Sequence, residues 1–125
     1  MINENKVSLW LGKFENAEAF NTYINIGYDE DGNTIPSNFQ IDFGIEKYDL
    51  EAVESDWMSD PCEDIDTLLT GFSNDFEIIP EIKPFLENID LKEYNSILLL
   101  YKFDYSQVNQ EGKEMRFIGT VDVNL

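Results

Sequence analysis

The stretch Asn95–Tyr105, NSILLLYKFDY, limits what this chain can fold into more than any other part of the sequence. It opens with the strongest apolar run of the chain, Ile97–Leu100, and then changes to alternation. The alternation predicts aromatic side chains on one face and charged side chains on the other: Tyr101, Phe103 and Tyr105 against Lys102 and Asp104. This pattern is typical of a strand that is buried on both faces at its start and on one face at its end.

A second alternating run follows close behind the first. Its apolar positions share one predicted face: Phe117, Gly119, Val121 and Val123. Residues 106–113 separate the two runs, which is too long a connection for a tight turn. The two runs therefore predict a C-terminal antiparallel hairpin with an irregular loop.

Residues 6–14, KVSLWLGKF, predict an N-terminal strand, because Val7, Leu9 and Leu11 alternate with other residue types. Trp10 lies on the face opposite these aliphatic side chains. We interpret Trp10 as core on a second covered face rather than as a binding anchor.

Two helices are predicted by their capping signals. Asn16 is a good N-cap for a helix over residues 17–26, and Ser37 for a short helix over residues 38–43. A glycine follows each segment, as is common at the C-terminal ends of helices.

A third helix start is predicted at Asp60, which we assign as the N-cap, with Pro61 in the first helical position and Glu63 three residues beyond the cap. The helix should end at Gly71. Its apolar side chains recur at helical spacing: Ile65, Leu68, Leu69 and Phe72.

Two segments are harder to assign. Residues 75–91 are rich in apolar side chains but contain Pro80 and Pro84, which predicts a short extended piece and then a helix beginning near Pro80 or Glu81. Residues 46–58 alternate weakly, so we predict a strand there and keep a helix as the alternative. The whole pattern predicts an α+β fold, a single domain over residues 1–125. Its antiparallel sheet includes the N-terminal strand and the C-terminal hairpin, with several helices packed on it.

The charge of the chain excludes some classes of partner and favours others. There are 26 acidic against 8 basic residues, for a formal net charge of −18. Binding to nucleic acid requires clustered Lys and Arg, and anionic membranes attract basic segments, so we expect neither partner. A basic protein partner is favoured.

The absence of histidine and the single cysteine limit the reactions and bonds that this chain could form. The chain has no histidine, the usual general base near neutral pH, and its one cysteine, Cys62, cannot form an internal disulfide. The polar N-terminus is unlike a signal peptide, and no apolar run reaches the ~20 residues of a membrane span. We expect a cytoplasmic protein that is not an enzyme and has no metal or other cofactor. The oligomeric state stays open.

Acidic residues cluster between residues 46 and 66, where Lys47 is the one base. An acidic surface with an embedded aromatic side chain suits a basic partner, because charge speeds the encounter and the ring anchors the contact. A solvated acidic face is the alternative. The predicted partner-binding residues all come from this segment: Asp49, Glu51, Glu54, Asp56, Trp57, Asp60 and Glu63.

Residues 28–36 form a predicted loop that invites a calcium interpretation. An EF-hand loop needs glycine at its sixth position and glutamate at its twelfth. Counted from Asp29, these positions hold Thr34 and Gln40. We therefore interpret the segment as a solvated turn.

Four segments follow one another along most of the chain: VSLWLGKF at 7–14, the helix with Phe20 and Tyr23, SNFQIDFGIEKYD at 37–49 with its acids, and the closing YKFDY and FIGTVDV. Together they resemble the immunity protein 22 family of bacterial polymorphic toxin systems. The resemblance implies a small cytoplasmic α+β protein, encoded beside a toxin, that binds the toxin domain and blocks it. It supplies no catalytic motif. The positions that match its acidic segment are Asp42, Asp49, Glu51 and Glu54.

Three functions remain to be compared. The first is an immunity protein that neutralises a cognate toxin, with a nuclease favoured because nucleases use basic clefts to grip anionic substrates. The second is a small carboxylate-based enzyme or cation-binding domain. The third is a general acidic adaptor or nucleic-acid mimic. We favour the first.

Overall fold

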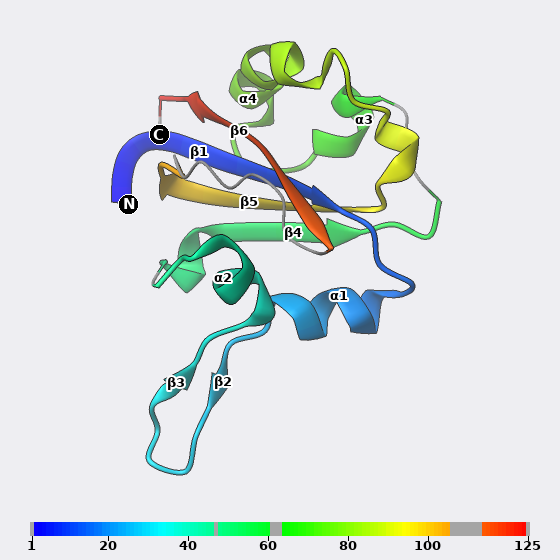
Figure 1. Ribbon diagram of the computed structural model, residues 1–125. Coiled ribbons are helices and arrows are strands. Elements are labelled where there is room, and N and C mark those ends of the chain that lie inside the picture. The colour runs from blue at the N-terminus through cyan, green and yellow to red at the C-terminus, as the bar shows by residue number, and fades with distance from the viewer. Residues whose placement is uncertain (1, 47, 61–63, 106–113, 125) are drawn as a thin grey trace.

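A four-stranded antiparallel sheet forms the middle of the molecule (Figure 1). The computed structural model describes residues 2–46, 48–60, 64–105 and 114–124. The strands lie in the order β4-β5-β1-β6. Their bounds are β1 (Ile2–Gly12), β4 (Val53–Trp57), β5 (Ser96–Phe103) and β6 (Met115–Asp122). The α+β class and the N-terminal strand are confirmed.

Helices cover both faces of this sheet. Figure 1 shows α3 and α4 over one face, and α1 and α2 over the other. The helices are α1 (Ala17–Ile24), α2 (Asn38–Phe43), α3 (Ile65–Leu69) and α4 (Asp75–Ile82). Three short 3₁₀ turns join these elements: η1 (Leu50–Ala52), η2 (Lys83–Leu86) and η3 (Leu91–Glu93). A small hairpin of β2 (Gly27–Tyr28) and β3 (Thr34–Ile35) extends away from the sheet (Figure 1).

Strand β1 contributes to both hydrophobic layers. Val7, Leu9 and Leu11 pack under α3 and α4, among the buried aliphatic side chains of β5 and those two helices. Trp10 points to the other face and is completely buried. Its ring centroid lies 5.0–5.8 Å from four other aromatic rings: Phe39, Phe43, Tyr105 and Phe117. The assignment of Trp10 to the core is confirmed.

The predicted C-terminal hairpin is wrong. Strands β5 and β6 both pair with β1, which lies between them, and they do not pair with each other. The physical reason is the apolar character of both faces of β1, which favours the central position in the sheet. The predicted hairpin loop, residues 106–113, lies outside the described residues.

The predicted alternation within β5 and β6 is also only partly correct. Lys102 has a left-handed backbone (φ 60°), so Tyr101 packs under α3 and α4 whereas Phe103 and Tyr105 pack with Trp10. In β6 the register shifts where Leu9 and Trp10 pair with Gly119 and Phe117. These irregularities reverse the facing of every residue beyond them, as β-bulges do.

Capping chemistry explains the outcome for the first two helices. The Asn16 side chain accepts from the Ala19 N–H at 2.8 Å, although α1 ends two residues before its predicted end. Ser37 and Gln40 form a complete capping box at α2, and Gly44 ends this helix in the left-handed conformation (φ 64°). Both predicted caps are confirmed.

The remaining local assignments need correction. Asp64 rather than Asp60 caps α3, while the predicted first turn, 61–63, lies outside the described residues. Helix α4 contains Pro80 and begins at Asp75, so the predicted extended piece is wrong. Pro80 costs this short helix one backbone hydrogen bond. The complete burial of Ile78 and Ile82 on the same helix offsets that loss. The strand predicted over 46–58 covers only β4, and η1 precedes it. The predicted loop over 28–36 includes the β2–β3 hairpin.

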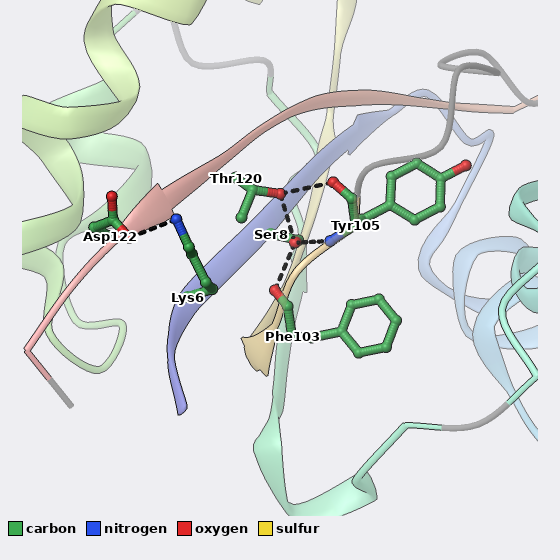
Figure 2. A network of polar contacts seen from close by, with 6 residues as sticks. All are labelled: Lys6, Ser8, Phe103, Tyr105, Thr120 and Asp122. Atoms are coloured by element: carbon green, nitrogen blue, oxygen red, sulfur yellow. Dashed lines mark hydrogen bonds and ion pairs between the residues drawn. The ribbon is translucent and has the colours of Figure 1, made fainter. Parts of the chain in front are cut away.

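A buried serine ties the end of β5 to the centre of the sheet (Figure 2). The Ser8 hydroxyl donates to the Phe103 carbonyl at 2.7 Å and accepts from the Tyr105 N–H at 2.9 Å. The Thr120 hydroxyl lies 2.8 Å from Ser8 Oγ and bonds to the Tyr105 carbonyl at 3.0 Å. These bonds satisfy backbone groups that the left-handed residue Lys102 displaces from regular strand pairing.

We therefore expect Ser8→Ala to lower the free energy of unfolding by about 1–3 kcal/mol, because it leaves buried backbone groups of β5 without their partner. Ser96→Ala is the matched control, since the Ser96 hydroxyl on β5 is also buried but has no hydrogen-bond partner among the described residues. Urea unfolding of both variants measures the difference. An equal loss in the two variants would contradict the role given to Ser8.

Candidate functional site

An acidic groove runs between the edge strand β4 and helix α3. It has a volume of about 970 Å³. One wall comes from β4 and the residues after it, including Glu54, Asp56 and Asp60. The other wall comes from α3 and the turn that follows it, residues 67–72.

The pairing of β4 determines which side chains enter the groove. Glu54 lies opposite Leu99 and Asp56 lies opposite Ile97 on β5. Both of these partners pack in the layer under α3 and α4. Because opposite residues in a sheet point to the same face, Glu54 and Asp56 also point to that side. Period-two spacing therefore puts two carboxylates on one face of the edge strand.

Glu54 fixes the far wall of the groove to the sheet. Its carboxylate accepts from the Ser73 N–H at 2.8 Å and from the Ser73 hydroxyl at 3.1 Å. The Tyr101 hydroxyl donates to the Ser73 carbonyl at 2.7 Å. Strands β4 and β5 thus hold the turn between α3 and α4 in place, and this sets the width of the groove.

Among the described residues, no basic side chain forms an ion pair with the carboxylates of the groove. In the part of the chain that the structure describes, no lysine or arginine lies within salt-bridge distance of Glu54, Asp56 or Asp60. The ion pairs that are present there join Lys6 to Asp122 and Lys83 to Asp66. Uncompensated carboxylates lining one concave surface create a negative potential that attracts cationic groups.

The other predicted partner-binding residues lie apart from the groove. Asp49 caps η1 by accepting from the Glu51 N–H at 2.9 Å, so both residues belong to the turn before β4. Trp57 is half-buried on the opposite face of the sheet, and its indole N–H donates to the Phe14 carbonyl at 3.2 Å. Glu63 lies outside the described residues. The structure therefore brings together three of the predicted acids without the predicted aromatic neighbour.

Sequence reasoning missed the second wall of the groove. Thr67, Thr70 and Phe72 line it, and Ser73 and Tyr101 hold it in place. Nothing in the spacing of these residues marks them, because they meet β4 only after α3 packs beside it. The period-two spacing of Glu54 and Asp56 could have indicated only the first wall, on β4.

The side chains that line the groove can interact with a partner through charge and hydrogen bonds. Within the residues that the structure describes, no group of three or more Asp, Glu, Cys or His side chains is arranged to hold a metal ion. In the turn predicted over 28–36, the Asp29 carboxylate is occupied by hydrogen bonds within the turn, since it accepts from the N–H groups of Asp31 and Asn33. No helix in the described ranges combines the length and apolar character needed to cross a bilayer.

Comparison with known proteins supplies the family. The family model described as Immunity protein 22 matches residues 7–124, nearly the whole chain. No curated protein and no solved structure matches it. The chain belongs to the Immunity protein 22 family, as the resemblance of its sequence motifs predicted. Membership implies a role in neutralising a toxin, and immunity protein families are generally non-enzymatic.

Tyr101, which lies behind the groove, makes the free energy of unfolding fall at alkaline pH. Burial, followed by the neighbouring Glu54 carboxylate, raises the pKa of Tyr101 well above its usual value of 10.0. Burial and the hydrogen bond to Asp42 raise the pKa of Tyr23 in the same way. Both hydroxyls stay protonated in the folded chain at pH values where they would ionise in the unfolded chain. Their contribution is complete below about pH 10 and declines as pH rises above it.

Tyr101→Phe and Tyr23→Phe should each flatten the decline of the unfolding free energy above about pH 10, by at most about 1.4 kcal/mol per pH unit. Below that pH the difference between each variant and the parent protein should stay constant. Urea unfolding between about pH 8 and about pH 12, the range over which an ordinary tyrosine ionises, measures the slopes. Curves that run parallel over the whole range would show that neither hydroxyl carries this effect.

Proposed function

We propose that this protein neutralises a cognate toxin domain by binding it through the groove between β4 and α3. The observation that carries the proposal is the set of carboxylates in that groove, Glu54, Asp56 and Asp60, which have no basic partner within the described residues. Like charges held on one surface destabilise the free protein. A cationic surface of the toxin relieves this repulsion when it binds.

A nuclease is the toxin class that this arrangement fits best. Enzymes that cleave nucleic acid bind phosphates through clusters of Lys and Arg, and a carboxylate-lined surface can occupy such a cleft in place of the substrate. The remaining excess of acid, within a net charge of −18, adds longer-range attraction. Salt limits that attraction to about 8 Å under physiological conditions, so the local cluster contributes most.

Residues outside the groove have secondary roles in this proposal. Asp49 and Glu51 lie next to β4 along the chain and extend the acidic surface beyond it. Trp57 supports β4 from the opposite face, where it packs against the aromatic layer. We propose that the protein acts in the cytoplasm as a single domain, without a cofactor.

Charge reversal within the groove tests the proposal. Asp56→Lys with Asp60→Lys should lower the rate of association with the toxin encoded by the neighbouring gene by about tenfold or more at low salt. It should also weaken the dependence of that rate on salt. Stopped-flow or surface-based kinetics over a series of NaCl concentrations measures both.

The control is Glu30→Lys with Asp31→Lys, two exposed side chains in the turn between β2 and β3. It changes the net charge by the same amount but lies away from the groove. Equal effects in the two double variants would mean that overall charge, rather than this surface, governs binding. An unchanged rate in the groove variant would exclude the groove as the binding site.

A further inference from the structure

Strand β4 is an edge strand of the sheet. It pairs with β5 on one side, and no strand in the described part of the chain pairs with its other side. Ser55 and Asp56 in the middle of the strand are exposed. Unpaired N–H and C=O groups along such an edge are a template for another strand.

The hydrogen bonds around β4 show which backbone groups point outward. The Met58 N–H donates to the Asn95 carbonyl at 2.8 Å, so Met58 and the residues two and four before it direct their backbone groups toward β5. The residues between them direct theirs away from the sheet. The Trp57 N–H already donates to the Asp56 carboxylate at 2.9 Å. Ser55 therefore offers both its N–H and its C=O to an added strand.

The two faces beside this edge differ in chemistry. On one face is the acidic groove, with Glu54 and Asp56 flanking Ser55 in the sequence. On the other face is a second hollow of about 440 Å³, to which Ser55 itself contributes. Its other walls are largely apolar and include Ile24, Tyr28 and Leu50. Tyr28 and Leu50 are 62% and 54% exposed, so both side chains are accessible to a partner.

We propose that β4 accepts an extended segment of the partner as a fifth strand, and that this segment carries an apolar residue between two basic residues. The apolar residue lies opposite Ser55 and exchanges two backbone hydrogen bonds with it, so its side chain enters the apolar hollow. The two basic neighbours lie opposite Glu54 and Asp56 and enter the acidic groove. The inference rests on the proposed function for the identity of the partner and deepens it by giving the binding mode.

Charge also decides against a second copy of this chain as the occupant. Antiparallel pairing of two β4 strands about Ser55 would place Glu54 of one copy opposite Asp56 of the other. Like charges directly opposite each other destabilise a strand pair, and each copy carries a net charge of −18. The same carboxylates that exclude self-pairing select a basic segment.

Synthetic peptides test the pairing without the toxin. The probe is a capped peptide in which Lys and Val alternate three times. Its controls are a peptide of the same composition with the lysines and valines in separate blocks, and one in which Glu alternates with Val. In NMR titrations of the ¹⁵N-labelled protein, the Lys–Val peptide should shift the amide signals of Glu54, Ser55 and Asp56 and slow hydrogen exchange at Ser55. Equal shifts with the block peptide would overturn strand addition in favour of simple charge attraction.

Ser55→Pro and Ser55→Ala test the pairing with the toxin domain. Proline is tolerated on edge strands where its missing N–H would face solvent, so Ser55→Pro should keep the fold and remove one of the two bonds to an added strand. It should weaken binding by about tenfold or more, whereas Ser55→Ala, which keeps the N–H, should change it by less than about threefold. If Ser55→Pro unfolds the protein, N-methylation of the central valine of the peptide removes the same pairing from the other side and should abolish its binding.

The outcomes separate this inference from the proposed function. Toxin that binds the parent protein without slowing hydrogen exchange at Ser55 would overturn strand addition while leaving the neutralising role intact. Toxin that does not bind at all would overturn the proposed function, and the peptide titration would still decide whether β4 accepts a basic strand. Dimerisation of the free protein through pairing of two β4 strands would overturn the charge argument against self-pairing.

Discussion

The burial of both faces of β1 is the constraint on which the rest of the structure depends. Val7, Leu9 and Leu11 need one covering layer and Trp10 needs another, so helices lie on both sides of the sheet and β1 takes a central position. Strand β1 lies between β5 and β6. Near Lys102 the chain leaves regular strand pairing, and the buried Ser8 hydroxyl forms hydrogen bonds with the backbone groups of Phe103 and Tyr105. The large majority of buried polar groups in protein cores are hydrogen-bonded, as the Ser8 hydroxyl is here.

The same arrangement leaves β4 at the edge and gives it two different neighbours. On the side that faces α3, β4 carries carboxylates. The hydrogen bonds that Ser73 donates to Glu54 fix the position of the α3–α4 turn relative to the strand. Toward α1 and the β2–β3 hairpin it adjoins exposed apolar side chains. An edge strand with acidic side chains resists pairing with neutral or acidic strands, which is how proteins protect such edges from aggregation. In the binding mode that we propose, the same property selects a basic partner.

Local signals predicted two of the three proposed helix caps correctly, whereas long-range pairing was predicted poorly. The capping residues Asn16 and Ser37 act within one helical turn, so their roles follow from the sequence alone. The position of β1 between β5 and β6 depends on contacts more than eighty residues apart along the chain, as in the bond from Ser8 to Phe103, and the apparent continuity of Phe117 with Val121 concealed a register shift. For the site, the cluster of acidic residues over 46–66 predicted the carboxylates of one wall of the groove. The wall from α3 and the inward packing of Trp57 depend on tertiary contacts that no spacing in the sequence reveals.

Native-state hydrogen exchange of the free protein tests the central claim most directly, because it compares the middle of the sheet with its edge in one experiment. The account predicts that the Trp10 amide in β1 exchanges only when the whole protein unfolds, with the free energy of global unfolding. It predicts that the outward-pointing Ser55 amide in β4 exchanges from the folded state, faster by orders of magnitude. Ser55 protection as strong as that of Trp10 would contradict a free, partner-accepting edge at β4.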